Sequence, residues 1–304
     1  MNGCGTGKTA DIQNPYSLTG DNSSVSNQFF ARNLCVTNDI NFGTDQVHAD
    51  YAEGAGVFDL TTKEVLYSQN LFEKLYPAST TKILTAYIII RNCDLDDKVT
   101  VSADAIANMA DSSKCGLAAG DVLTVRDLLY GLLLVSGNDA ANVLAEYYSG
   151  SIDKFAEEMN REAKALGATQ SHFVNANGLP DPNHYTSAHD MALIMQECIK
   201  NETFCRIESD LTYTIQPTNM TSTPRDLQNH HALLFQDGQW GYKGAFAGKT
   251  GYTDEAHNTL VTAAKRGNMT LVCVVLTCDN LDYINDTRTV LDLSLIHISE
   301  PTRP

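Results

Sequence analysis

The spacing of hydrophobic and polar positions predicts two β-hairpins, one near each end of the chain. Apolar residues occupy most of positions 55–59 and 64–68, and the polar turn residues between these two runs favour a hairpin. Towards the other end, 258–265 and 269–277 are mostly apolar or β-branched, and they flank Arg-Gly-Asn. Glycine in so short a connection is typical of a hairpin turn, so we expect a second pair of strands here.

Between the two hairpins the spacing changes to that of helices. A Ser/Thr cluster at 79–81 leads into the apolar run 83–90, which is how a buried helix begins. Further helices are predicted at 124–135, 139–148, 152–166 and 188–200. Strands at both ends with helices between them indicate a sheet assembled from distant segments and interrupted by a helical insertion, a fold of the mixed α/β (α+β) class.

Composition narrows the class of partner. The chain has 304 residues, enough for a sizeable core, and 43% of them are hydrophobic, as in ordinary globular proteins. The formal net charge is −16, which repels phosphate backbones and argues against nucleic acid as a partner. No stretch of about 18 apolar residues occurs, so we expect no membrane-spanning helix.

Cysteines and histidines do not have the spacing of a metal site. The eight cysteines are scattered singly, without the Cys-x-x-Cys pairs of zinc or redox motifs. Free thiols are the default interpretation, and paired disulfides stay open. The histidines at 184 and 189 and the adjacent pair 230–231 also match no metal motif, so we predict neither a metal nor another cofactor.

The two ends differ in composition from the centre. Residues 1–45 are rich in Gly, Ser, Thr, Asn and Asp without periodicity, which indicates a flexible tether. Asn-Gly-Cys at 2–4 resembles the end of a bacterial lipoprotein signal, so Cys4 is either a candidate lipid anchor or part of a chance Gly-Cys pair. Residues 293–304 resemble a translated sequencing adapter, and we expect the native sequence to be interrupted after a helix at 283–292.

Ser79 and Lys82 are the first candidates for chemistry. Three residues apart on a helix, their side chains lie on one face and can touch. At a helix start, the backbone N–H groups and the dipole favour negative charge on the serine or on a carbonyl oxygen that it attacks. Apolar neighbours after Lys82 would bury its amine, lower its pKa and make it a base for the serine. Because Ser-x-x-Lys alone is common, it needs support from other motifs.

Two further polar motifs lie beside apolar segments. Ser-Gly-Asn at 136–138 stands between two apolar helical stretches, where polar groups must find partners or line a cleft. Lys-Thr-Gly at 249–251 precedes a predicted strand. Its lysine and threonine can bind a carboxylate, and its glycine lets a substrate approach the strand edge. Either motif alone is equally explained by a turn or a loop.

The order of the three motifs is more specific than any one of them. Ser-x-x-Lys, then Ser-x-Asn, then Lys-Thr-Gly is the signature of β-lactamases and penicillin-binding proteins. Within this group, residues 46–292 resemble the catalytic domain of the low-molecular-mass D-Ala-D-Ala carboxypeptidases, peptidase family S11. The stretches that match beyond the short motifs are 76–82, 136–141, 173–179, 184–192 and 248–253.

This resemblance implies a β-lactamase/transpeptidase-like fold, an antiparallel sheet flanked by helices plus an all-helical lobe, with the active site between them. It also implies a substrate, the acyl-D-Ala-D-Ala end of the peptidoglycan stem peptide, and β-lactam antibiotics as inhibitors. An enzyme of the cell wall works outside the cytoplasm, in the cell envelope. Family members commonly carry a C-terminal β-rich domain, so we expect the natural chain to continue beyond residue 292.

The resemblance assigns roles to individual residues. Ser79 is the nucleophile, Lys82 takes its proton, and Ser136 relays a proton to the departing D-alanine. Asn138 holds the substrate amide and helps to orient Lys82. Lys249 and Thr250 meet the terminal carboxylate, and Gly251 leaves room for the substrate at the strand edge. The backbone N–H groups of Ser79 and Tyr252 form the oxyanion hole.

Three other functions share parts of this signature. A class A β-lactamase needs a glutamate that activates the deacylating water, and Glu197-x-x-x-Asn201 has this spelling, although at the end of a predicted surface helix. A non-hydrolytic β-lactam sensor domain would sit beside transmembrane helices, which the apolar runs do not predict. A D-alanyl-D-alanine endopeptidase hydrolyses the same kind of bond, and motifs alone do not separate it from a carboxypeptidase.

Overall fold

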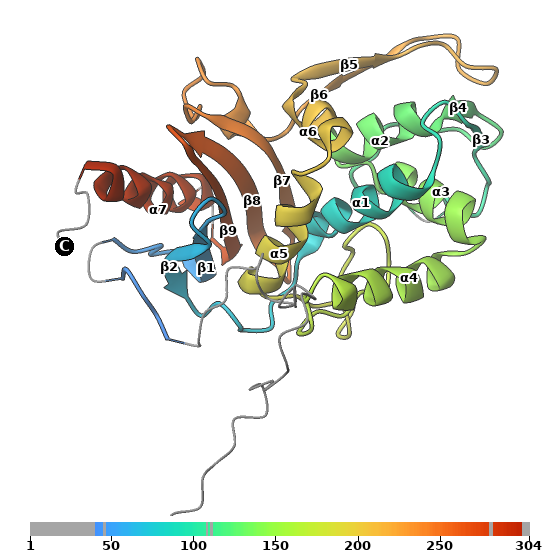
Figure 1. Ribbon diagram of the computed structural model, residues 1–304. Helices are drawn as coiled ribbons and strands as arrows, with labels where there is room; N and C mark the ends of the chain where they lie inside the picture. Colours follow the sequence, from blue (N-terminus) through green and yellow to red (C-terminus); the bar gives the residue numbers. More distant parts are fainter. Residues whose placement is uncertain (1–39, 45–46, 108, 110–111, 280–281, 300–304) are drawn as a thin grey trace, which may run out of the picture. The chain divides into compact units, whose positions relative to one another are not determined.

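A five-stranded antiparallel sheet forms the centre of the fold. The computed structural model describes residues 40–44, 47–107, 109, 112–279 and 282–299 (Figure 1). The strands follow the order β2-β1-β9-β8-β7 and comprise β1 (Ala52–Asp59), β2 (Glu64–Gln69), β7 (Ala245–Thr253), β8 (His257–Arg266) and β9 (Met269–Cys278). The first two strands and the last three are far apart in the sequence, so the sheet is assembled from distant segments, as predicted.

Helices lie beside this sheet and on both of its faces. The helical segments are η1 (Ala78–Thr81), α1 (Lys82–Asn92), α2 (Val125–Leu133), α3 (Asn138–Ser149), α4 (Ile152–Ala165), α5 (Ala188–Cys198), α6 (Glu202–Ser209), η2 (Ala232–Leu234) and α7 (Asp282–Ser299). Helices α1 to α4 gather into a lobe at one side of the sheet (Figure 1). Two small hairpins edge this lobe, β3 (Lys98–Thr100) with β4 (Val122–Thr124) and β5 (Thr212–Ile215) with β6 (Arg225–Gln228).

The middle strand β9 is buried on both faces. Cys273 and Val275 belong to a hydrophobic cluster shared with α7, whereas Val272 and Val274 belong to a second cluster shared with α5. Successive side chains of a strand point to opposite faces of the sheet. Burial on both faces therefore requires the continuous apolar run that predicted this strand.

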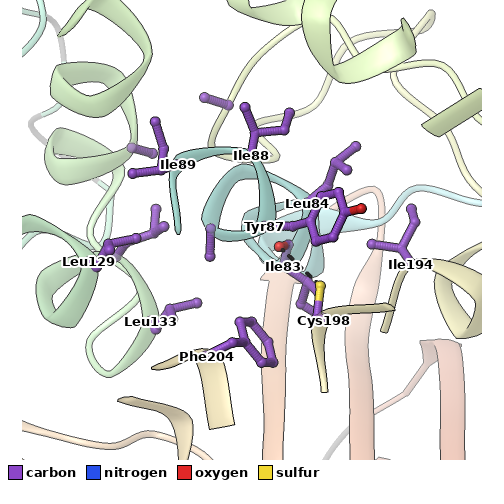
Figure 2. Packing of buried hydrophobic residues seen from close by; sticks show 14 of the residues in the cluster. Ile83, Leu84, Tyr87, Ile88, Ile89, Leu129, Leu133, Ile194, Cys198 and Phe204 are labelled. Atoms are coloured by element: carbon purple, nitrogen blue, oxygen red, sulfur yellow. Dashed lines mark hydrogen bonds between the residues drawn. The ribbon is translucent and has the colours of Figure 1, made fainter. Parts of the chain in front are cut away.

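Helix α1 runs through the centre of the helical lobe. Ile83, Leu84, Ile88 and Ile89 are fully buried, and Figure 2 shows side chains of α2, α5 and α6 packed around them. A helix that is apolar on all sides has to be enclosed by other elements. Because Ser79 lies in η1, the 3₁₀ turn that leads directly into α1, this enclosure holds the serine in place.

Most predicted elements are present. Both hairpins and the helices α2 to α5 are confirmed, with ends close to the expected ones. Helix α6 and the two small hairpins are not predicted, because their apolar positions are too few to set a period. The last helix runs to Ser299 instead of ending at residue 292, and Leu293 is buried in the cluster of α7, so the expected end of that helix was wrong.

The N-terminal segment is described only in part. Phe42, which the prediction places in the tether, exchanges two backbone hydrogen bonds of 2.9 Å with Ser68 of β2. Cys4 and most of the tether lie outside the described residues, so the tether, the lipid anchor and the boundary at residue 46 stay predictions.

The described residues hold six cysteines, all unpaired thiols, at positions 93, 115, 198, 205, 273 and 278. Over the same part of the chain, no helix is long and apolar enough to cross a bilayer. Nor do three or more His, Cys, Asp or Glu side chains of the described residues converge as metal ligands would.

Candidate active site

Ser79 lies in the 3₁₀ turn that leads into α1, where three chain segments meet. Its neighbour Ala78 has a left-handed backbone with φ of 47°. A Cβ atom at Gly251 would lie 2.7 Å from Ser79 N, and one at Gly178 would lie 1.8 Å from the carbonyl oxygen of Ala78. Only residues without a side chain allow so close an approach. Glycine at these two positions therefore brings β7 and the 173–179 segment against the serine.

Lys82, the first residue of α1, places its amine among three oxygens. Nζ lies 2.7 Å from Ser79 Oγ, 2.7 Å from Asn138 Oδ1 and 2.6 Å from the carbonyl oxygen of Asn177. The Lys82 side chain is fully buried. This burial, and after it the charge of Lys249, lowers the pKa of Lys82 well below its ordinary value.

The lowered pKa of Lys82 favours a neutral amine, and its neighbours can accommodate that form. The side-chain oxygen of Asn138 and the backbone carbonyl of Asn177 can only accept hydrogen bonds. The three oxygens could accept the three N–H groups of an ammonium ion, whereas a neutral amine uses two N–H groups for these two acceptors and turns its lone pair to the Ser79 hydroxyl. The arrangement therefore offers Ser79 a proton acceptor at hydrogen-bond distance.

The Ser-Gly-Asn motif forms the turn between α2 and α3. Ser136 has φ of 59°, which is uncommon for a residue with a side chain, and Asn138 is the first residue of α3. The Asp139 carboxylate accepts the backbone N–H groups of residues 115–117 at 3.0 to 3.1 Å. Asn138 N donates to the carbonyl oxygen of Ser113 at 2.8 Å. These bonds tie the turn to the preceding loop and so fix Ser136 and Asn138.

The Lys-Thr-Gly motif lies within β7 itself. This strand is the last of the sheet and pairs only with β8 among the described strands, so its other edge is open to a ligand. Lys249 is fully buried, and its Nζ donates to the carbonyl oxygen of Thr250 at 2.9 Å. Burial lowers the pKa of Lys249 to about 8, and the carboxylate of Glu208 opposes this shift.

These segments enclose one cleft of about 620 Å³. The predicted site residues that line it are Ser79, Ser136, Asn138, Thr250, Gly251 and Tyr252. Lys82 and Lys249 are buried directly behind them. The structure therefore brings together all the residues that the sequence indicates, from η1, α1, the turn before α3, and β7.

Some residues of the cleft escape sequence reasoning. Asn177 reaches Lys82 through its backbone, and its side-chain amide donates to Asn142 Oδ1 at 3.0 Å. The match of 173–179 to the family points to this stretch, but a backbone carbonyl leaves no signature of residue type. His230 also lines the cleft, and burial lowers its pKa. Nothing in the local sequence around His230 indicates either property.

Glu197, the glutamate that a class A β-lactamase would require, lies elsewhere. It is near the end of α5, forms an ion pair with Lys200 and is not among the residues that line the cleft. This segment therefore supplies no group to activate a deacylating water.

Comparison with known proteins identifies the family. The family model for D-alanyl-D-alanine carboxypeptidase, Peptidase S11, matches residues 42–280. The chain is 38% identical over 232 residues to D-alanyl-D-alanine carboxypeptidase DacF of Bacillus subtilis. The matched region covers 75% of this chain and 57% of DacF. The chain is also 37% identical over 225 residues to DacB2 of Mycobacterium tuberculosis, and the matched region covers 72% of each protein. The chain thus spans little more than half the length of several curated relatives.

Solved structures share the fold. The DD-transpeptidase of Streptomyces K15 matches with a TM-score of 0.75 and 31% identity, over 81% of this chain and 97% of that one. The D-alanyl-D-alanine carboxypeptidase of Mycobacterium tuberculosis matches with a TM-score of 0.74 and 32% identity, over 81% and 91%. These matches confirm the expected penicillin-binding-protein fold, with its antiparallel sheet and helical lobe. The family model and the relatives together show that the chain belongs to the D-alanyl-D-alanine carboxypeptidases of peptidase family S11.

Proposed function

We propose that this chain is a serine D-Ala-D-Ala carboxypeptidase that removes the terminal D-alanine from peptidoglycan stem peptides through an acyl-enzyme. The observation that carries the proposal is the distance of 2.7 Å between Ser79 Oγ and the buried Nζ of Lys82, beside a cleft that the other two motifs also line. The relatives named D-alanyl-D-alanine carboxypeptidase support the same reaction.

Acylation begins at Ser79. Its hydroxyl proton moves to the lone pair of Lys82 while Oγ attacks the carbonyl carbon between the two D-alanines. As the C–N bond breaks, Ser136 gives its hydroxyl proton to the departing amine and is reprotonated from Lys82. Ser79 is left as an ester of the shortened peptide.

The attacked carbonyl oxygen becomes negatively charged in the transition state. We assign the backbone N–H groups of Ser79 and Tyr252 to this oxygen. The close approach of Gly251 to Ser79 N supports the assignment, because it places the two backbone segments side by side. The start of α1 adds the positive end of a helix dipole.

The substrate runs along the open edge of β7 in this proposal. Lys249 and Thr250 meet the terminal carboxylate, Asn138 holds the substrate amide, and Gly251 leaves room at the strand edge. Lys249 must then be an ammonium ion, whereas Lys82 must be neutral. These requirements are compatible, because the charge of Lys249 is itself one cause of the lowered pKa of Lys82.

Water hydrolyses the ester and releases the shortened peptide. β-Lactams mimic the substrate and acylate the same serine. We further propose that the protein is secreted, acts in the cell envelope and contributes to cell shape through its effect on the cell wall. Cys4 is the candidate lipid anchor and lies outside the described residues.

Release of D-alanine from a diacyl-D-Ala-D-Ala peptide tests the proposal. We expect release by the wild type and by Ser149→Ala, but not by Ser79→Ala. Ser149 ends α3, at the opposite end of that helix from Asn138, and serves as the matched control. No release by the wild type would refute the carboxypeptidase, and release by Ser79→Ala would refute the nucleophile. A cross-linked peptide assayed in parallel distinguishes an endopeptidase, which would cleave the cross-link.

A further inference from the structure

A buried carboxylate lies behind the strand that carries the Lys-Thr-Gly motif. Glu208 of α6 is fully buried, although Glu202 and Arg206 of the same helix are exposed. Its Oε2 accepts the backbone N–H of Gly248 at 3.3 Å. Its Oε1 is buried without a hydrogen-bond partner among the described residues. A buried carboxylate with so few hydrogen bonds is costly, so it needs compensation from its surroundings.

The compensation comes from Lys249, the residue after Gly248. Within the described part of the chain, no carboxylate lies at ion-pair distance from Lys249 Nζ, which donates a hydrogen bond to the backbone carbonyl oxygen of Thr250. Burial raises the pKa of Glu208 to about 8, and Lys249 acts against that rise, so Glu208 carries its negative charge on the alkaline side of that value. Burial lowers the pKa of Lys249 to about 8, and Glu208 acts against that fall. Each buried group therefore stabilises the charged form of the other.

No other group around β7 supplies this negative charge. The titratable and charged side chains on the elements packed against β7, and on the segments that adjoin them, are Glu202, Cys205, Arg206 and Glu208 of α6, Asp210 after it, His230 and His231 before η2, Asp237, Tyr242 and Lys243 between η2 and β7, Lys82 after η1, Tyr252 of β7, Asp254 and Glu255 after it, and His257, Lys265 and Arg266 of β8. The carboxylic acids of this set other than Glu208 are exposed, except for the half-buried Asp210. Burial and then Lys249 lower the pKa of both histidines, to about 4 for His231. Glu208 is thus the one buried carboxylic acid of the set.

We propose that Glu208 is a positioning residue for Lys249: it anchors the backbone before the Lys-Thr-Gly motif, and in the alkaline range it supplies the negative charge that keeps Lys249 an ammonium ion. The inference rests on the proposed function, because it concerns the group that meets the substrate carboxylate. Glu208 does not line the cleft and acts only through Lys249.

Removal of the Glu208 charge should shift the pH dependence of the reaction in one direction. Without the carboxylate the pKa of Lys249 falls, because burial is then unopposed. Binding of the substrate carboxylate therefore weakens at high pH, and the alkaline limb of kcat/KM moves to lower pH. The acid limb reports Lys82 in the proposed mechanism. Lys249 is protonated at that pH with or without Glu208, so the acid limb stays in place.

Glu208→Gln removes the charge but keeps an oxygen for the N–H of Gly248. We expect the alkaline limb of kcat/KM for D-alanine release to move down by about 1 pH unit, with KM rising more than kcat falls. Glu158→Gln is the matched control, because Glu158 is a buried glutamate of α4 paired with Arg161, and its profile should equal that of the wild type. An alkaline limb of kcat/KM that keeps its wild-type position in Glu208→Gln overturns the inference. A loss of kcat/KM that is equal at every pH overturns it as well.

Two further measurements keep the test decisive. If thermal melting shows that Glu208→Gln is unfolded, Glu208→Asp replaces it. The shorter carboxylate lies farther from β7, so the alkaline limb should move partway in the same direction, and an unmoved limb overturns the inference. The same pH series is recorded for labelling of Ser79 by a fluorescent penicillin, which also carries a carboxylate. Wild-type labelling without D-alanine release refutes the proposed function alone, and the alkaline limb of labelling then decides the role of Glu208.

Discussion

Asn138→Asp tests whether Lys82 is a neutral base. Asn138 Oδ1 lies 2.7 Å from Lys82 Nζ, so the substitution puts a carboxylate of nearly the same shape beside a buried amine. At an effective dielectric constant of about 20, opposite unit charges about 4 Å apart attract each other by about 4 kcal/mol. One pKa unit corresponds to about 1.4 kcal/mol. The pKa of Lys82 should therefore rise by up to about 3 units, less the cost of burying the new carboxylate.

The sign of the effect follows from the role of the base. Burial and the charge of Lys249 lower the pKa of Lys82 in the wild type, which extends the neutral form to lower pH. A raised pKa returns the amine to the ammonium form, so the acid limb of acylation moves to higher pH by about 1 to 3 units. Below the new pKa the acylation rate falls by about 10- to 1000-fold, and it recovers as the pH is raised.

The assay is the rate at which a fluorescent penicillin labels Ser79, measured over the pH range in which circular dichroism shows a folded protein. Asn92→Asp makes the same chemical change at the exposed far end of α1 and should label like the wild type. An acid limb that keeps its wild-type position in Asn138→Asp, with a loss that is equal at every pH, would refute the reasoning. It would mean that Asn138 only binds substrate and that Lys82 is not the base.

Lys82→Arg should not be labelled by penicillin, because a guanidinium stays protonated and cannot accept the proton of Ser79; clear labelling would contradict the base role. Gly178→Ala should destabilise the fold by at least about 1 kcal/mol in urea unfolding, because φ is 88° and its Cβ would lie 1.8 Å from the Ala78 carbonyl oxygen. An unchanged unfolding midpoint would speak against this close approach. Glu197→Gln should leave turnover of a chromogenic cephalosporin unchanged, since Glu197 lies outside the cleft; lost turnover would restore the β-lactamase interpretation.

Local spacing predicts an element well where one strong pattern decides which faces are buried. The continuous apolar run of β9 and the apolar run of α1 are examples, because each element is enclosed on all sides. Helix α6 is the opposite case. Its short sequence mixes apolar and charged positions, and only packing against β7 shows that Glu208 faces inward while Glu202 and Arg206 face solvent.

Some features of the candidate site can likewise be predicted from the sequence, whereas others appear only in the structure. The order of Ser-x-x-Lys, Ser-x-Asn and Lys-Thr-Gly indicates the nucleophile and the binding residues without a structure, because each motif needs particular side chains at fixed spacing. The contribution of Asn177 could not be predicted, since the atom that reaches Lys82 belongs to the backbone. The close contacts at Gly178 and Gly251 join segments far apart in the chain, so their need for glycine appears only when those segments meet.

The sequence by itself determined the helices beside Ser79 and Ser136, the family, and which serine and lysines to consider, but not the strand β7 that carries the Lys-Thr-Gly motif. Tertiary structure decided the protonation states that the proposed chemistry needs. Lys82 and Lys249 are the same residue type and both are buried, yet the first lies in the field of a second cation, whereas the second lies in front of a buried acid. A pKa depends on burial and on nearby charge, and here both come from residues that only folding brings together.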